Sequence, residues 1–167
     1  MFWRRSRRGS ESPDNPYHGL RLQLLNTDPK SIGIAPSARL PRVWGAAIEM
    51  AYLNGTATVV GLADGTTSMY TSTGGGVIGG GAHESVAQAT SEWLALTETM
   101  LDLFPVDSDT GLPPTNYVTV RAFTYEGHRA VTAPEDDLGH GRHAASPLFL
   151  AAHRVISELR LIDEQHC

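Results

Sequence analysis

Hydrophobic residues recur along the chain with two different spacings, and the change from one to the other predicts where helices and strands lie. Three segments carry apolar residues three and four positions apart, the spacing that places them on one face of a helix. These segments are residues 42–53, residues 83–104 and a segment that begins at Ser146-Pro147. Serine before proline favours a helix start, because the serine side chain caps the helix and proline fits its first turn. The spacing therefore predicts three helices.

Two pairs of strand-like runs alternate with these helices. Residues 56–62 and 66–71 are rich in β-branched residues and are joined by an Asp-Gly sequence at 64–65, which is typical of a hairpin turn. Residues 117–124 and 128–132 form a second pair joined by Glu-Gly. The order helix-hairpin-helix-hairpin-helix predicts an α+β fold, with three helices and a mostly antiparallel sheet of about 4–5 strands.

The remaining segments divide the chain into three parts. Residues 1–18 are basic and polar and are predicted to be a disordered arm. Residues 19–36 are predicted to be extended, because leucines occupy positions 20, 22 and 24. Residues 37–167 are predicted to form a single α+β domain, in which the polar, glycine-containing residues 133–145 form a loop.

Composition indicates a folded protein and bears on the cellular compartment in which we expect it. Hydrophobic residues make up 41% of the chain and charged residues 19%, which is enough apolar material for one core. No apolar run approaches the roughly 18 residues of a membrane span. The one cysteine, Cys167, cannot form a disulfide within the chain, so we expect a reducing, cytoplasmic location.

The net charge of −5 conceals an asymmetry between the arm and the rest of the chain. Four of the 13 basic residues lie in the first eight positions, which leaves nine basic and 18 acidic residues for the remainder. An acidic body repels phosphate backbones, so we expect no nucleic-acid partner. In the arm, Phe2, Trp3, Arg4 and Arg5 combine aromatic rings with positive charge. They predict peripheral contact with an anionic membrane surface, the alternative being a solvated tail.

Residues 73–81 are the most unusual stretch of the sequence, because six of these nine residues are glycine and a predicted helix follows them. A glycine loop before a helix can bind phosphate through its backbone amides and the helix dipole. The candidate ligand-binding residues are Gly74, Gly75, Gly76, Gly79, Gly80, Gly81 and His83. The stretch lacks a lysine followed by serine or threonine, and Glu84 would repel an anion. The alternative, which the residues favour, is that the glycines permit a bulged strand, a tight turn and close packing.

The seven histidines raise the possibility of a metal site. His140 and His143 lie close together, with Asp136 just upstream, and imidazole and carboxylate groups are ligands for zinc or manganese. The spacing matches no established metal signature and no cysteine pair supports it, so a solvated or interface loop is the alternative. No cofactor is expected, and no residue is assigned a catalytic role.

The order of elements, the hairpin at 64–65 and the apolar strand before it resemble the roadblock/LC7 family, whose outline is shared by profilin-like domains. The resemblance covers roughly residues 42–162 and rests on topology. It implies a domain that dimerises and acts without catalysis, as a scaffold or regulator for small GTPases and motors.

Two functions remain as hypotheses. The first is a non-enzymatic interaction or regulatory module that binds a protein partner and forms a homodimer. The second is a small domain that binds a ligand or phosphate, or an enzyme, whose site joins the glycine stretch 73–81 to nearby histidines. The first predicts exposed apolar side chains, and the second predicts a concave pocket with a titrating histidine.

Overall fold

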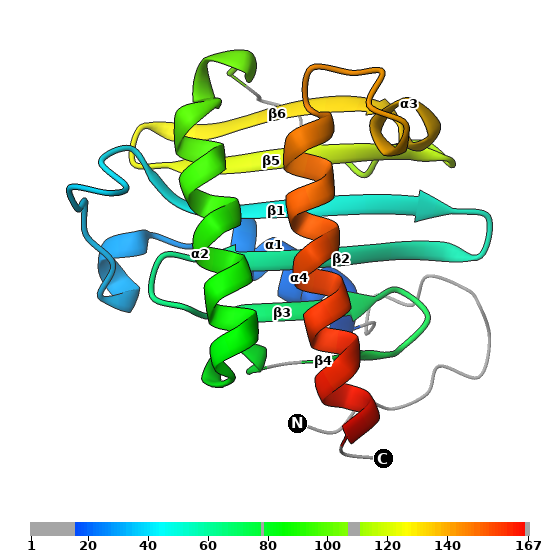
Figure 1. The fold of residues 1–167 in the computed structure, drawn as a ribbon, viewed down its shortest axis with the longest axis horizontal. Helices are drawn as coiled ribbons and strands as arrows, with labels where there is room; N and C mark the ends of the chain where they lie inside the picture. The colour runs from blue at the N-terminus through cyan, green and yellow to red at the C-terminus, as the bar shows by residue number, and fades with distance from the viewer. Residues whose placement is uncertain (1–15, 78, 107–110, 166–167) are drawn as a thin grey trace.

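The protein is built on one antiparallel sheet. A computed structural model describes residues 16–77, 79–106 and 111–165 of the chain. Within these residues the sheet has six strands in the order β4-β3-β2-β1-β5-β6 (Figure 1). The strands are β1 (Val43–Tyr52), β2 (Gly55–Leu62), β3 (Thr67–Thr71), β4 (Gly76–Val77), β5 (Tyr117–Thr124) and β6 (Gly127–Pro134).

Four α-helices and three short 3₁₀ helices complete the described residues. The α-helices are α1 (Pro16–Leu25), α2 (Glu84–Thr99), α3 (Glu135–Gly139) and α4 (Ser146–Gln165). The 3₁₀ helices are η1 (Pro29–Ile32), η2 (Gly80–Ala82) and η3 (Leu101–Leu103). The α+β class is as the sequence predicts, and five of the strands have five or more residues, with the two-residue β4 added at one edge.

The prediction of a helix over 42–53 is wrong, because this segment is the central strand β1. It pairs with β2 on one side and β5 on the other, and every residue of β1 except Tyr52 is buried. A bulge between Val43 and Gly45 shifts the alternation of the strand, so that Val43, Ala46 and Met50 all contact the same core. Their spacing of three and four residues therefore imitates a helix, and burial on both faces removes the polar positions that would reveal a strand.

The turn that follows β1 contains a sequence that is typical of more than one structure. As a sequence, Asn54-Gly55 favours a helix end, but Tyr52 pairs with Gly55 across a two-residue hairpin turn. Asn-Gly is typical of both features, so the error in the helix also concealed a hairpin.

The prediction that residues 19–36 are extended is also wrong for its first part. Residues 16–25 form α1, which includes the last three residues of the predicted disordered arm. The buried residues of α1 are Tyr17, Arg21 and Leu25, which are four positions apart. The middle one is a charged residue, so hydrophobicity alone could not show this helical repeat.

Several other elements lie where the sequence predicts them. The hairpins β2–β3 and β5–β6 pair in antiparallel register, and α4 begins at Ser146. The helix predicted over 83–104 is divided into α2 and η3. The polar segment 133–145, predicted as a loop, contains the five residues of α3.

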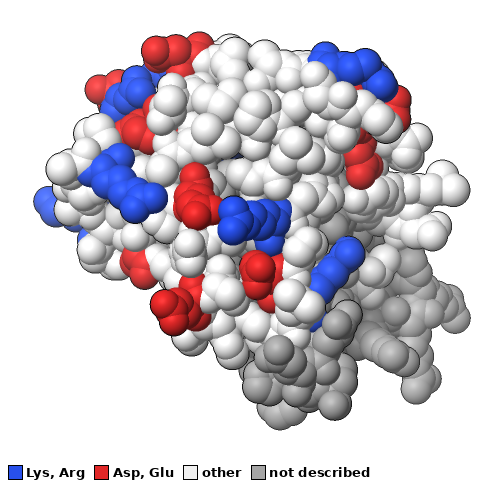
Figure 2. Space-filling model, in the orientation of Figure 1, with Lys and Arg blue, Asp and Glu red and all other residues white. Residues whose placement is uncertain are grey.

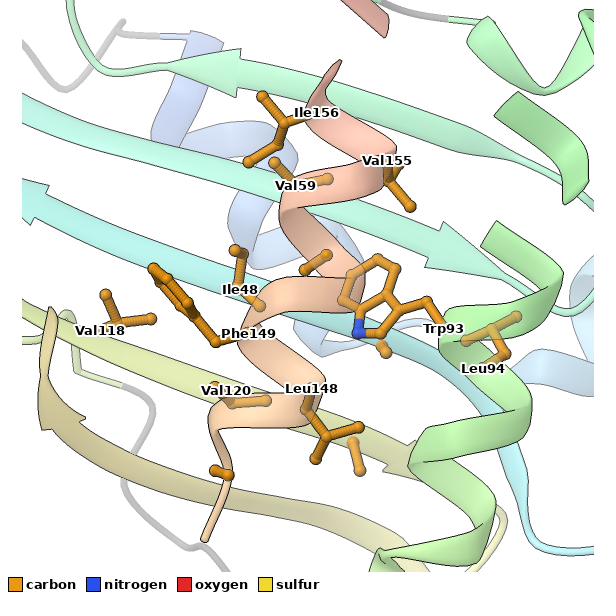
Figure 3. Packing of buried hydrophobic residues seen from close by; sticks show 14 of the residues in the cluster. Ile48, Val59, Trp93, Leu94, Val118, Val120, Leu148, Phe149, Val155 and Ile156 are labelled. Carbon is orange, nitrogen blue, oxygen red and sulfur yellow. The ribbon is translucent and has the colours of Figure 1, made fainter. Parts of the chain in front are cut away.

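The main core lies between the sheet and the two long helices. Figure 1 shows α2 and α4 side by side across one face of the sheet, and Figure 3 shows Trp93 and Leu148 directed into the space between them and the strands. Both side chains are fully buried. A Cβ atom on Gly61 of β2 would lie 2.7 Å from Thr90 and 3.1 Å from the Trp93 ring, so the glycine permits α2 to pack this closely.

The second face of the sheet carries a smaller core under α1. Trp44 and Phe123 stack there with their ring centroids 5.1 Å apart, and Tyr17 of α1 is completely buried beside them. The protein therefore has three layers, with α1 on one side of the sheet and α2 and α4 on the other.

Candidate functional site

A row of polar side chains crosses the second face of the sheet, where apolar residues would be expected. Tyr70, Thr58, Glu49, Thr119 and Thr132 are successive partners across five strands, so their side chains share one face. The first four are buried, with Glu49 only 2% exposed.

Glu49 is the centre of a buried charge network. The Arg21 guanidinium of α1 donates to Glu49 at 2.5 Å, and the Arg121 guanidinium of β5 donates to the same carboxylate at 2.7 Å. Arg121 also donates to the carbonyl of Gly111 at 3.0 Å. The Tyr17 hydroxyl lies 2.7 Å from that of Thr58, and burial raises the pKa of Tyr17 to about 12. These interactions attach α1 to the sheet, and we interpret them as structural.

A pocket lies elsewhere, between α3 and α4 at one end of the sheet. Its volume is about 590 Å³, and we call it the histidine pocket. It is lined by Asn116, Tyr117, Pro134, Glu135, Asp136, Gly139, His140, Phe149 and His153. These residues come from the start of β5, the end of β6, and helices α3 and α4.

Asn116 ties these elements together through its backbone. Its N–H donates to the carbonyl of Ala51 at 2.8 Å, and its carbonyl accepts from the N–H of Glu135 at 3.0 Å. Asn116 has a φ of 68°, which makes it the one non-glycine residue with positive φ in the described part of the chain. Asparagine tolerates this conformation better than most residues, and such strain is common at functional sites.

His153 forms the part of the pocket wall that α4 contributes. The centroid of its ring lies 4.3 Å from the centroid of the Phe149 ring. Its Nε2 atom is buried without a hydrogen-bonding partner among the described residues. Burial, and secondarily the positive charge of Arg160, lower the pKa of His153 below its usual value. The ring is therefore neutral at pH 7, with one nitrogen able to donate and the other to accept a hydrogen bond.

The carboxylates of the pocket differ in their partners. Asp136 pairs with Arg142 at 2.5 Å and with the His140 ring at 3.2 Å. Glu135 lies 3.5 Å from the Tyr52 hydroxyl, and this carboxylate contributes to raising the pKa of Tyr52, after burial itself. The arrangement offers hydrogen-bonding groups and negative charge beside two aromatic rings.

The predicted metal ligands do not form a cluster. His140 and Asp136 lie together in the pocket, but the Nδ1 atom of His143 accepts a hydrogen bond from the amide of Ala145 at 3.0 Å. Across the described ranges, no three histidine, cysteine, aspartate or glutamate side chains are placed to hold a metal ion.

The glycine stretch is divided between a strand and a turn. Gly76 belongs to β4 and pairs with Tyr70, whereas Gly80 and Gly81 belong to η2. A Cβ atom on Gly80 would collide with Leu159, and one on Gly81 would collide with the carbonyl oxygen of Gly65. Close packing thus explains these two glycines, and the same holds for Gly76, whose Cβ would collide with the carbonyl oxygen of Met69. Gly74 and Gly79 have positive φ, which turns the chain, and an added Cβ at Gly75 would meet only the Thr71 side chain at 3.6 Å.

His83 lies at a separate place. It precedes the first turn of α2 and lines a pocket of about 470 Å³ with Glu84 and Glu158. Figure 1 shows the start of α2 and helix α3 near opposite edges of the sheet. His83 and His140 therefore line different pockets, and a site that joins the two, which is one form of the second hypothesis, is not formed. The predicted membrane contacts Phe2, Trp3, Arg4 and Arg5 lie outside the described residues.

Sequence reasoning missed most of the histidine pocket. Three of its lining residues belong to separate parts of the predicted structure: Asn116 to the end of a loop, Tyr117 to a strand and Phe149 to the apolar stripe of a helix. Only the folded chain brings them together. His153 did carry a signal, since it lies at the edge of the apolar stripe of α4.

Comparison of the chain with protein-family models, curated proteins and solved structures finds no match. Among the described helices, none is long and apolar enough to cross a membrane.

Proposed function

We propose that this protein is a non-enzymatic domain that binds a small polar molecule in the histidine pocket. The observation that carries the proposal is the combination of a cavity of about 590 Å³ with two imidazoles and two carboxylates in its lining. Pockets of about 300–1,000 Å³ with a few convergent polar groups are typical of small-molecule sites. The described lining of the pocket contains no serine, threonine, cysteine or lysine that a neighbouring base could activate, which favours binding over catalysis.

The charges of the pocket indicate which molecules it would accept. Glu135 and Asp136 are acidic, and the neutral His153 adds no positive charge at pH 7. Arg142 pairs with Asp136 but does not line the cavity. A neutral alcohol or a protonated amine therefore suits the pocket better than an anion, and the Phe149 and Tyr117 rings add apolar surface.

The test is an NMR titration that follows the histidine ring signals of the labelled protein. The probes are ethanolamine, choline, glycerol, glucose and inorganic phosphate, each added separately. We expect at least one amine or alcohol to shift the signals of His153 and His140 while leaving His83 in place. Phosphate should shift neither pocket histidine.

Two alanine variants locate the binding. His153→Ala should abolish the response at His140, whereas His83→Ala should leave it intact because His83 lines a different pocket. Signals that respond to none of the five probes, or that respond only at His83, would contradict the proposal.

A second candidate function is the interaction module, supported by exposed leucines on α4. Leu150 and Leu161 are 53% and 52% exposed on the outer side of this helix. Figure 2 shows acidic and basic side chains interspersed over the face of the molecule that α2 and α4 cover. Arg154 of α4 and Glu92 of α2 form an ion pair with a distance of 2.9 Å. Leu150 and Leu161 lie on this face of α4 with the exposed Arg154 between them, so they are two separate apolar side chains within a charged surface. Apolar side chains surrounded by polar ones are typical of a protein contact.

Light scattering coupled to size-exclusion chromatography, at two concentrations about a hundredfold apart, tests this candidate. A homodimer that Leu150→Arg converts to a monomer would support a contact through α4. A monomer at both concentrations, or a dimer that the substitution leaves unchanged, would exclude this homodimer.

A further inference from the structure

A second cavity lies on the opposite side of the sheet from α4, and its lining is mainly aliphatic. Its volume is about 320 Å³, and we call it the α1 groove. The side chains that form its apolar walls come from α1, η1, β2 and β3. They are Leu20, Leu24, Ile32, Val60, Leu62 and Tyr70. The volume is at the lower end of the ~300–1,000 Å³ range of small-molecule sites.

The groove is preformed, because α1 is fixed on the sheet by residues that do not line it. Arg21 is bound to Glu49, and Tyr17 lies within hydrogen-bond distance of Thr58. The carbonyl of Leu25 lies 2.9 Å from the Nε2 atom of His128. The helix is thus held along the side that faces the sheet, while the adjacent side, with Leu20 and Leu24, forms a wall of the groove. A rigid wall lowers the cost of ordering a bound ligand.

One charge distinguishes the groove from a plain apolar cavity. Asp64 is the only ionisable side chain in its lining among the described residues, apart from the Tyr70 phenol, which burial keeps protonated. The other polar lining residues are neutral, namely Gln23, Thr27, Thr66 and Ser68. Asp64 lies in the turn between β2 and β3, where its carboxylate accepts a hydrogen bond from the amide of Thr66 at 2.9 Å. The negative charge therefore lies at one edge of an apolar wall.

We propose that the α1 groove binds a single-chain amphiphile with a protonated amine, whose alkyl tail lies between α1 and β2 and whose ammonium group lies beside Asp64. The aliphatic walls favour the tail through the removal of apolar surface from water. The carboxylate attracts the ammonium group of the amine. It repels the carboxylate of a fatty acid with an alkyl tail of the same length. This site is independent of the histidine pocket.

Displacement of the neutral fluorescent probe N-phenylnaphthylamine from the full chain tests the proposal. Decylamine, decanol and decanoate are compared as competitors below their micelle-forming concentrations. We expect the probe to fluoresce more strongly when bound, decylamine to displace it best and decanoate to displace it least. No enhancement with the wild-type protein, or displacement by decanoate as strong as by decylamine, would overturn the assignment.

Asp64→Asn isolates the contribution of charge, because asparagine keeps an oxygen that can accept from Thr66. The affinity for decylamine should fall about fivefold, the size expected for an exposed ion pair, while that for decanol stays constant. An unchanged preference for decylamine in this variant would contradict the placement of the ammonium group.

Filling the groove tests its location. Leu24→Trp and Ser68→Trp place an indole in the cavity from two different elements, α1 and β3, and each should abolish probe binding. Leu53→Trp is the matched control, because Leu53 is 89% exposed in the turn between β1 and β2 and does not line the groove. Circular dichroism confirms that each variant is folded. Probe binding by both folded groove variants at wild-type affinity would exclude this site.

Discussion

At the scale of single residues, the protein buries polar groups that do not all have partners. The hydroxyl of Tyr70 and the Nε2 atom of His153 are buried without hydrogen-bonding partners in the described parts of the chain. The hydroxyl of Tyr17 lies beside Thr58. An unsatisfied buried polar group costs about 1–3 kcal/mol, so these side chains offer direct tests of the local energetics.

Tyr70→Phe should leave the free energy of unfolding unchanged or raise it by about 1 kcal/mol, because it removes a buried hydroxyl that has no partner. Tyr17→Phe is the matched comparison and should lower that free energy by about 1 kcal/mol, since it removes a hydroxyl 2.7 Å from Thr58. Urea denaturation measures both. The interpretation fails if Tyr70→Phe is the more destabilising of the two.

His153 should make the protein less stable in acid. Its pKa is lower in the folded protein than the ordinary value of about 6.5, because burial disfavours the charged ring. The contribution of neutral His153 to stability is therefore fully present above about pH 6.5. It is lost as the pH falls through the pKa that His153 has in the folded protein, because the unfolded chain binds the proton first. His153→Gln should lose less stability than the wild type between about pH 7.5 and pH 5 in thermal melts. Equal losses in the two proteins would show that His153 does not contribute.

The candidate site could be predicted from the sequence only in part at this scale. The sequence predicts His140 and Asp136 as part of one site because they are near neighbours along the chain, and both line the histidine pocket. His143 is predicted for the same reason, but its Nδ1 atom accepts a hydrogen bond from the amide of Ala145 instead, just before α4. Proximity in sequence does not determine the direction of a side chain, and His153 joins the pocket from another element.

At the scale of elements, α1 shows how a charged residue can anchor a helix. Arg21 is 8% exposed and Glu49 is 2% exposed, so their pairing takes place away from water. Breaking one partner of a buried ion pair is costly because the other charge keeps its desolvation penalty.

Glu49→Gln should lower the free energy of unfolding by about 3 kcal/mol, because it removes the carboxylate that accepts from both Arg21 and Arg121. Glu92→Gln is the control. It breaks the exposed pair with Arg154 and should cost less than about 1 kcal/mol. Chemical denaturation of the two variants gives both values, and similar losses would argue against a special role for the buried network.

The two long helices that the sequence predicted correctly each have one buried face. The stripe of α2 and the start of α4 are visible because polar residues alternate with apolar ones at a helical period. In β1 the nearly complete burial removes that contrast, and the bulge adds a misleading spacing. In α1 the opposite problem arises, because a buried arginine interrupts the apolar repeat.

At the scale of the whole molecule, the antiparallel sheet separates two cores of different character. The long helices α2 and α4 cover one face of the sheet and pack on it with aliphatic and aromatic side chains. Helix α1 covers the other face, where the row of polar side chains crosses the strands. The α+β class followed from the sequence because hairpins and helices alternate along the chain. The strand order did not follow, since it depends on β1 being the central strand.

The backbone amides of β1 between Ala46 and Met50 should exchange with deuterium most slowly of all described strands. They lie in the central strand, which is paired on both sides and covered on both faces. Exchange should be faster in β3, whose edge is covered by only the two residues of β4. Mass spectrometry or NMR measures the rates, and faster exchange in β1 than in β3 would refute the expected gradient.

The connection between α1 and β1 has a consequence for how the molecule could be taken apart. Residues 35–39 are exposed, whereas α1 itself is fixed to the sheet by Arg21 and Tyr17. A protease site introduced into this connection should be cut without unfolding the protein. The severed N-terminal piece should then remain bound as a noncovalent subunit, and Glu49→Gln should release it. The covalent chain would thus be replaced by a two-component complex whose dissociation constant reports directly on the buried ion pair.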